Sequence, residues 1–170
     1  MKEETINLKG IVTINFFDHF GRVTRTIEEN NLVTNAGKNF FVNKIIDEPS
    51  IAGSAVQSIA LGDGSTVPTE TDTALENETG RIQISSISSS NNIGEFVTSI
   101  SAGVATGTIQ EAGLYTSDDT PILISRIVLS SPFVKQPNES ITVSWRFKIG
   151  SDGGTSQPYV EPGYVQNEYV

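Results

Sequence analysis

Short stretches in which apolar and polar residues alternate recur along most of the chain. The two clearest run from Ile6 to Ile14 and from Ser140 to Ile149. Alternation with a period of two is typical of strands that bury one face. Turn sequences, such as the one at residues 18–21, separate these stretches. The pattern predicts a mainly β, antiparallel, β-sandwich-like domain, and it places Trp145 on a core-facing position.

Further strands are expected at residues 22–27, 56–61, 81–87, 95–100, 106–115 and 122–129. The polar run 28–31 is expected to end a strand, and the polar run 88–92 to form a loop. One short helix is predicted over about residues 35–46, because Thr34 or Asn35 can cap it and Pro49 lies just beyond its end. Its apolar residues four positions apart, at 41 and 45 and at 42 and 46, predict a stripe that faces the sheet.

Length and charge limit the classes of function. A chain of 170 residues suits one domain. Its formal net charge of −9 makes a nucleic acid an unlikely partner in electrostatic terms, since phosphates would be repelled. The sequence has no cysteine, which excludes disulfides and thiolate metal sites. It has no apolar run of membrane-spanning length, and its polar, acidic N-terminus argues against a secretory signal peptide.

A long connection with little periodicity covers residues 62–80. Connections of this length are uncommon in compact domains unless they have a function or contain a short helical turn, for which 72–76 is the candidate. Carboxylates gather here, and calcium prefers such oxygen ligands, but their spacing does not match an EF-hand loop. A solvated acidic loop is therefore favoured over a calcium site; the acids are Asp63, Glu70, Asp72, Glu76 and Glu78.

Catalytic patterns are scarce. The one histidine, His19, lies in a predicted turn, where a solvated role is favoured over a place in a catalytic triad. Glu95 and Glu111 are conceivable acids of a glycosidase, but nothing in their spacing selects them. Nucleophile elbows, phosphate loops, zinc motifs and dinucleotide fingerprints do not occur. We therefore expect no enzyme, no cofactor and no small-molecule ligand.

The last residues form a separate unit of the sequence. A body of residues 1–149 is followed by an acidic, extended arm of residues 150–170, whose segment 151–156 has the composition of a flexible linker. Tyr159, Tyr164 and Tyr169 each precede valine, at a spacing of five residues. A disordered tail is one interpretation. The other is an arm whose tyrosines bind a neighbouring subunit, because tyrosine is enriched at interfaces.

Several residues of the body are candidates for structural roles. Gly62 and Gly64 are expected to allow a positive-φ turn where a buried strand ends. Arg81 is expected to pair with Glu78 or with Glu111, or to be solvated. Gly113 is expected to mark a bulge or a close approach of the backbone.

Three phrases, in this order and spacing, resemble the phage tail-collar fibre family and related virion proteins. The first is the sequence 31–38. The second is 59–64 with Pro68, Thr73, Leu75, Glu78 and Arg81. The third is 111–115, ahead of a strand that contains Arg126. The resemblance covers roughly residues 31–149. It implies a β-rich structural module of a tailed-phage particle, and it carries over no catalytic residues.

The expected function is therefore that of a non-enzymatic structural protein of a tailed bacteriophage. It would be one subunit of a symmetric neck, collar, tail or baseplate assembly, made in the host cytoplasm and present in the virion. Its partners would be further copies of itself and other virion proteins, with no membrane involved. Two alternatives stay open: a capsid decoration protein on the head exterior, and a carbohydrate-binding module for host attachment.

Overall fold

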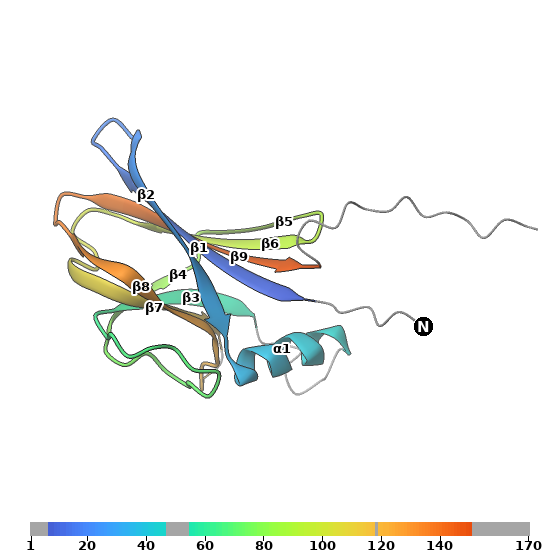
Figure 1. Cartoon of the computed structure of the whole chain (residues 1–170). Coiled ribbons are helices and arrows are strands. Elements are labelled where there is room, and N and C mark those ends of the chain that lie inside the picture. The colour runs from blue at the N-terminus through green and yellow to red at the C-terminus, as the bar shows by residue number, and fades with distance from the viewer. Residues whose placement is uncertain (1–6, 47–54, 118, 151–170) are drawn as a thin grey trace, which may run out of the picture.

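The computed structural model describes residues 7–46, 55–117 and 119–150, which form an antiparallel β domain with one helix (Figure 1). The strands and the helix are, in chain order, β1 (Leu8–Phe17), β2 (Val23–Val33), α1 (Asn35–Ile45), β3 (Val56–Gly62), β4 (Glu78–Gln83), β5 (Ser86–Ser90), β6 (Ile93–Ile100), β7 (Gly107–Thr116), β8 (Leu123–Lys135) and β9 (Ser140–Ile149). The predicted fold class is confirmed: the domain is mainly β and sandwich-like. Residues 151–170 lie outside the described residues.

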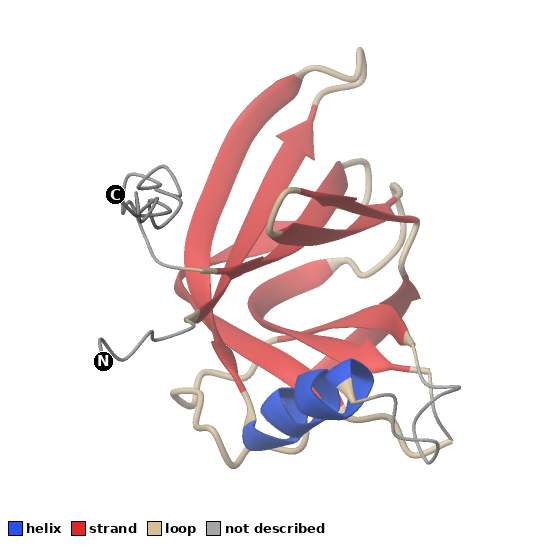
Figure 2. Ribbon diagram, turned by 90° about the vertical axis from the view of Figure 1, so that its right-hand side faces the viewer, coloured by secondary structure: helices blue, strands red, loops and turns tan. Residues whose placement is uncertain are grey.

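The strands form a single curled sheet of nine strands in the order β4-β3-β7-β8-β2-β1-β9-β6-β5. Strand β2 joins the two halves: most of it pairs with β1, whereas only Leu32 and Val33 pair with β8. The halves therefore separate along most of β2 and face each other across a core, as Figure 2 shows.

The other side of the sandwich is closed by β4 and β5, which are nearly continuous in the chain. At the bend between them, the Ile84 N–H donates to the Gln57 carbonyl of β3 at 2.8 Å, and the Ser85 N–H donates to the Val97 carbonyl of β6 at 2.7 Å. One stretch of chain thus passes from the edge of one half to the edge of the other. Within the described residues, each of these two strands has a partner strand on one side only.

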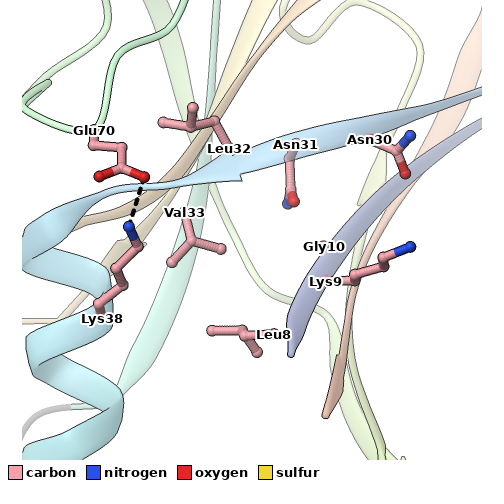
Figure 3. A pocket seen from close by; sticks show the side chains of 9 residues that line it. All are labelled: Leu8, Lys9, Gly10, Asn30, Asn31, Leu32, Val33, Lys38 and Glu70. Carbon is pink, nitrogen blue, oxygen red and sulfur yellow. Dashed lines mark ion pairs between the residues drawn. The ribbon is translucent and has the colours of Figure 1, made fainter. Parts of the chain in front are cut away.

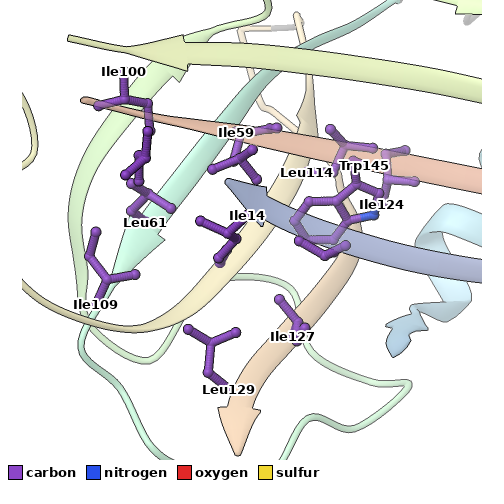
Figure 4. Close-up of a cluster of buried hydrophobic side chains, with 14 of the residues drawn as sticks. Ile14, Ile59, Leu61, Ile100, Ile109, Leu114, Ile124, Ile127, Leu129 and Trp145 are labelled. Atoms are coloured by element: carbon purple, nitrogen blue, oxygen red, sulfur yellow. The ribbon is translucent and has the colours of Figure 1, made fainter. Parts of the chain in front are cut away.

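The core is filled from both halves of the sheet (Figure 4). Its members are almost free of solvent contact, and they include Ile14, Ile59, Ile100, Leu114, Ile124, Ile141 and Trp145. The Ser140–Ile149 strand has the predicted bounds, and its alternating residues point inward, so the core position of Trp145 is confirmed.

The polar run 28–31 does not end a strand as predicted, because β2 continues to Val33. The polar side chains of this run have partners on other strands. Glu28 forms an ion pair with Arg146 of β9 at 2.9 Å. Glu29 accepts hydrogen bonds from Ser130 of β8, where the two backbones have separated. Asn31, with its amide oriented to satisfy its neighbours, donates to the Gly10 carbonyl and accepts from the indole N–H of Trp145.

The helix begins as predicted, with the Thr34 hydroxyl accepting from the Gly37 N–H at 2.9 Å. The predicted stripe is wrong at Val42, Ile45 and Ile46, which are exposed, whereas Phe41 packs against Phe147 of the sheet. The helix also packs through Gly37 and Phe40, and an alanine Cβ at Gly37 would lie only 2.0 Å from the Ile124 carbonyl oxygen. The glycine thus lets the start of the helix lie directly against β8.

Two local predictions are also wrong. Residues 86–90 form strand β5, which pairs with β6 from Ser86 to Ser90, so the polar residues 88–90 are part of a strand and not of a loop. Residues 72–76 contain no helical turn. The connection 62–80 is instead held to the sheet by side chains.

Candidate functional site

A buried glutamate on β7 is the centre of the polar contacts in the domain. The Glu111 side chain has no exposed surface. Its Oε1 accepts from the N–H groups of Asn77 at 2.7 Å and Gly64 at 3.2 Å, and its Oε2 accepts from the Glu76 N–H at 3.1 Å. All three donors belong to the connection 62–80. The carboxylate thus replaces the hydrogen bonds that this long loop would otherwise lack.

Arg126 on β8 compensates the charge of Glu111. Arg126 lies directly opposite Gly113 of β7 in the sheet. Glu111 is two residues before Gly113 on the same strand, and therefore on the same face as Arg126. The guanidinium donates to Glu111 Oε2 from Nε at 3.0 Å and from Nη2 at 2.8 Å. Its Nη1 donates to Asp72 Oδ2 at 2.7 Å. We call Glu111, Arg126 and Asp72 the buried ion-pair cluster.

The acids of the connection bond mainly to the connection itself. Asp72 accepts from the Thr69 hydroxyl at 2.6 Å and from the Thr69 N–H at 3.0 Å. Glu76 accepts from the N–H groups of Ser65 and Thr66, both at 2.7 Å. These carboxylates organise local turns, and Asp72 also reaches Arg126. In the part of the chain that the structure describes, no group of three or more His, Cys, Asp or Glu is arranged to hold a metal ion.

The environment of Asp72 gives the cluster a dependence on pH. Burial raises the pKa of Asp72, but the hydrogen bonds from Thr69 and the contact with Arg126 outweigh it, so the pKa of this carboxyl lies below its ordinary value. Because the pKa of Asp72 is lower in the folded than in the unfolded state, its ionised form stabilises the fold at pH values above the unfolded-state pKa. This stabilisation is lost as the pH falls through the folded-state pKa.

We therefore expect the Asp72→Asn variant to lose less thermal stability than the wild type when the pH is lowered from about 5 to about 2. Melting temperatures followed by circular dichroism across this range test the expectation. Asp119→Asn, at an exposed aspartate between β7 and β8, controls for the change in net charge. An acid response of Asp72→Asn identical to that of the wild type would contradict the role of Asp72.

The roles of Gly62 and Gly64 differ from the predicted one, because neither has a positive φ. Both instead allow the loop to approach Glu111. A Cβ at Gly64 would lie 2.4 Å from Glu111 Oε1, and one at Gly62 would lie 2.3 Å from the Asn77 carbonyl oxygen and 2.7 Å from Glu111 Oε1. Such distances are too short for any side chain. These glycines are therefore required by packing and not by a turn conformation.

Gly113 allows a close approach, one of its two predicted roles, and the ladder is regular at this position. A Cβ there would lie 2.8 Å from Leu123 Cδ1, 3.0 Å from Leu75 Cδ2 and 3.1 Å from a ring carbon of Tyr115. Leu75 belongs to the connection, and its N–H donates to the Tyr115 hydroxyl at 3.1 Å. The absence of a side chain at Gly113 thus lets Leu75 pack onto β7.

We expect Gly113→Val to lower the free energy of unfolding by about 1–3 kcal/mol through overpacking against Leu75 and Leu123. The neighbouring atoms are ends of flexible side chains, so the protein should still fold. Chemical denaturation of the purified variant measures the loss. An unchanged midpoint and slope would reject the packing role.

Arg81 pairs with Glu78, the first of the two partners considered for it, and not with Glu111. Its Nη2 and Nε donate to the Glu78 carboxylate at 2.6 and 2.9 Å. The guanidinium also lies over the Tyr115 ring, 3.8 Å from its centroid. Such a cation–π contact fixes the start of β4 against β7.

The structure does not bring the conceivable catalytic residues together. Glu95 lies on β6 in one half of the sheet and accepts from the Ser144 hydroxyl. Glu111 lies in the other half, and His19 is in the β1–β2 turn, stacked on Phe20 with ring centroids 3.8 Å apart. Both carboxylate oxygens of Glu111 already accept hydrogen bonds from other groups of the protein.

Sequence reasoning missed two buried cations. Arg126 was noted only as part of a phrase, although a charged residue in an otherwise apolar strand is a usable signal of a buried ion pair. Lys135 at the end of β8 is also fully buried, and its Nζ donates to the carbonyls of Ser101 at 3.1 Å and Glu139 at 2.8 Å. Burial lowers the pKa of Lys135. Its bonds hold two loops together.

A hollow of about 440 Å³, lined by both polar and apolar residues, lies between β1, β2 and the start of α1 (Figure 3). Two of its lining residues, Lys38 and Glu70, form an ion pair at 2.7 Å. This pair connects α1 to the connection 62–80.

No protein-family model, curated protein or solved structure matches this chain. Among the described residues, no helix is long and apolar enough to cross a membrane. The three candidate interface residues, Tyr159, Tyr164 and Tyr169, lie outside the described residues.

Proposed function

We propose that this chain is a non-enzymatic structural subunit of a tailed-bacteriophage particle, in a symmetric neck, collar, tail or baseplate assembly. One observation carries the proposal. The phrases that resemble tail-collar proteins supply the residues that hold the connection 62–80 on the sheet, with Glu111 at the centre. These residues stabilise the fold. A protein whose distinctive residues stabilise its fold is expected to act through the surfaces that it presents to other proteins.

The β1–β2 hairpin is one such surface. It extends beyond the rest of the sheet in Figure 1 and carries Phe20 at its tip, with 70 % of the residue exposed. The turn is rigid, because Asp18 Oδ1 accepts from the N–H groups of Phe20 and Arg22 at 2.9 and 3.0 Å. A large aromatic side chain on a rigid, protruding turn is a typical anchor for a neighbouring protein.

Edge strand β5 is a second surface. Its five residues are exposed, and Ser86–Ser90 contains no charged residue or proline. Charges and prolines are the usual means by which edge strands avoid pairing with other chains. An edge without them favours contact with a neighbouring subunit, and the Tyr–Val pairs of the C-terminal arm offer a further contact.

We expect Phe20→Ser to leave the free energy of unfolding within about 0.5 kcal/mol of the wild type, because the side chain is exposed. Incorporation into particles should nevertheless fall severalfold, measured by mass spectrometry of purified virions. The control is Val67→Ser, because Val67 is 75 % exposed but lies outside the β1–β2 hairpin. It should have no effect on incorporation. Equal incorporation of the two variants would remove the hairpin from the interface.

The position of the chain in an electron-microscopy map of the intact particle tests the proposal itself. Density at the neck, collar, tail or baseplate, repeated by symmetry, is the expected result. Density on the head exterior, with binding of the protein to capsid lattice alone, would make it a decoration protein. Absence from particles, together with binding on a glycan array, would overturn the structural role.

A further inference from the structure

An apolar groove of about 410 Å³ opens between α1 and the ends of β1, β6 and β9. Among the described residues, none with a charged side chain lines it. Most of its walls are large apolar side chains: Leu8, Phe41, Ile93, Phe96, Phe147 and Ile149. Phe147 is the base of the groove, with the Phe41 ring edge-on to it at a centroid distance of 5.1 Å and the Phe96 ring at 6.4 Å. Aromatic walls of this kind favour an aromatic or branched apolar occupant.

The groove is open because glycine occupies position 94. Gly94 on β6 is the direct cross-strand partner of Phe147, and a Cβ at Gly94 would find no atom within 4 Å. Gly10 flanks Phe147 on the other side, but there a Cβ would collide with the Asn31 side chain. The space beside Phe147 is therefore filled on the β1 side and empty on the β6 side.

The chain leaves the described domain at this groove. Ile149 is part of its wall, and the Ile149 N–H donates to the Asn92 carbonyl at 3.0 Å. The Gly150 N–H donates to the Asn7 carbonyl at 3.0 Å. These bonds fix the chain up to Gly150, so residues 151–170 begin next to the opening.

The chemistry of this segment suits the groove. Residues 151–170 contain three Tyr–Val pairs, at positions 159–160, 164–165 and 169–170. The Tyr–Val pairs supply the aromatic and branched apolar side chains that the groove would accept.

The length of the segment favours binding within one chain. Tyr159 lies ten positions after Ile149, and a flexible linker of this length has a root-mean-square span of roughly 17 Å. A span comparable to the distance to be bridged gives an effective concentration in the millimolar range. Even weak affinity for a Tyr–Val pair is then sufficient for occupancy.

We propose that the groove binds a Tyr–Val pair of the C-terminal segment of the same chain, with Tyr159–Val160 as the pair. Its Tyr ring occupies the space beside Phe147 that Gly94 leaves open. This inference does not depend on a role in a phage. It means that Tyr159 of the C-terminal segment is bound to its own domain in the free subunit, before any neighbouring subunit is present.

Photo-crosslinking of the full chain tests the proposal. The photoreactive amino acid p-benzoylphenylalanine replaces Tyr159, and an equal mixture of isotopically light and heavy protein is irradiated and analysed by mass spectrometry. We expect crosslinks to Phe41, Phe96 or Ile93, within light or within heavy chains only. Crosslinks that mainly join light to heavy chains, or that map to another surface, would overturn it.

A groove-filling variant provides the matched comparison. Gly94→Leu should reduce the crosslink yield at least fivefold, whereas Gly80→Leu, at a glycine on β4 where a Cβ would meet only Ala105 at 3.8 Å, should not change it. Equal yields in the two variants would overturn the proposal. If Gly94→Leu does not fold, the crosslink positions in the chain with native Gly94 decide by themselves.

Discussion

Replacing Glu111 by glutamine is expected to lower the free energy of unfolding by about 3–5 kcal/mol, because removal of one partner leaves the buried Arg126 charge uncompensated. Glutamine keeps the shape of the side chain, but its amide nitrogen is a donor. At this site it would face the N–H groups of Gly64, Glu76 and Asn77 or the guanidinium, all of which are donors themselves. Domains of this kind have a total stability of about 5–15 kcal/mol, so the loss is large.

Chemical denaturation of purified protein measures this loss, and Glu28→Gln is the matched control. Glu28 also pairs with an arginine, Arg146, but 55 % of its side chain is exposed. Exposed ion pairs contribute about 1 kcal/mol or less. A loss in Glu111→Gln no larger than that in Glu28→Gln would contradict the importance of the buried cluster.

The Glu111→Gln/Arg126→Met double variant sharpens the interpretation. Methionine removes the uncompensated charge, so the double variant should be clearly less destabilised than the sum of the two single variants. Strict additivity would indicate that the two side chains act independently of each other.

Replacing Gly64 by alanine is expected to cost about 3 kcal/mol, at the upper end for an added methyl group. The new Cβ would lie 2.4 Å from Glu111 Oε1 and 2.6 Å from Glu76 Cβ. Glu111 cannot move aside without breaking its bonds to Arg126 and Asn77, so the loop itself must shift.

Gly80→Ala is the comparison, since a Cβ there makes only an ordinary contact with Ala105 at 3.8 Å. It should be neutral or stabilising by a few tenths of a kcal/mol, because alanine restricts the unfolded chain. Thermal and chemical denaturation of both variants decide. A Gly64→Ala protein as stable as Gly80→Ala would show that the loop does not need its close approach to Glu111.

Strands were predictable where one face is buried along their whole length. The alternation from Ser140 to Ile149 indicated both ends of β9, because its partners β1 and β6 cover it on both sides. The end of β2 was not predictable, since its polar residues bond to strands that are distant in sequence. Glu29 and Ser130, for example, are brought together only by the curl of the sheet.

The site was predictable only in part. Its glycines and Glu111 lay in the sequence phrases singled out, and the observed partner of Arg81, Glu78, was one of the possibilities left open for it. The contact between Glu111 and the connection joins positions 34–47 residues apart. No local pattern states which carboxylate reaches which amide, so a positive-φ turn was the simplest local explanation for two glycines that in fact make room for a side chain.

Amide hydrogen exchange tests the central claim, that Glu111 holds the connection 62–80 on the sheet. The backbone N–H groups of Gly64, Glu76 and Asn77 are the ones it binds. Measured by NMR under native conditions, these amides should be protected in the wild type and should exchange about 100-fold faster in Glu111→Gln, while amides within β9 change less. Unprotected amides in the wild type, or equal exchange rates in both proteins, would contradict the account.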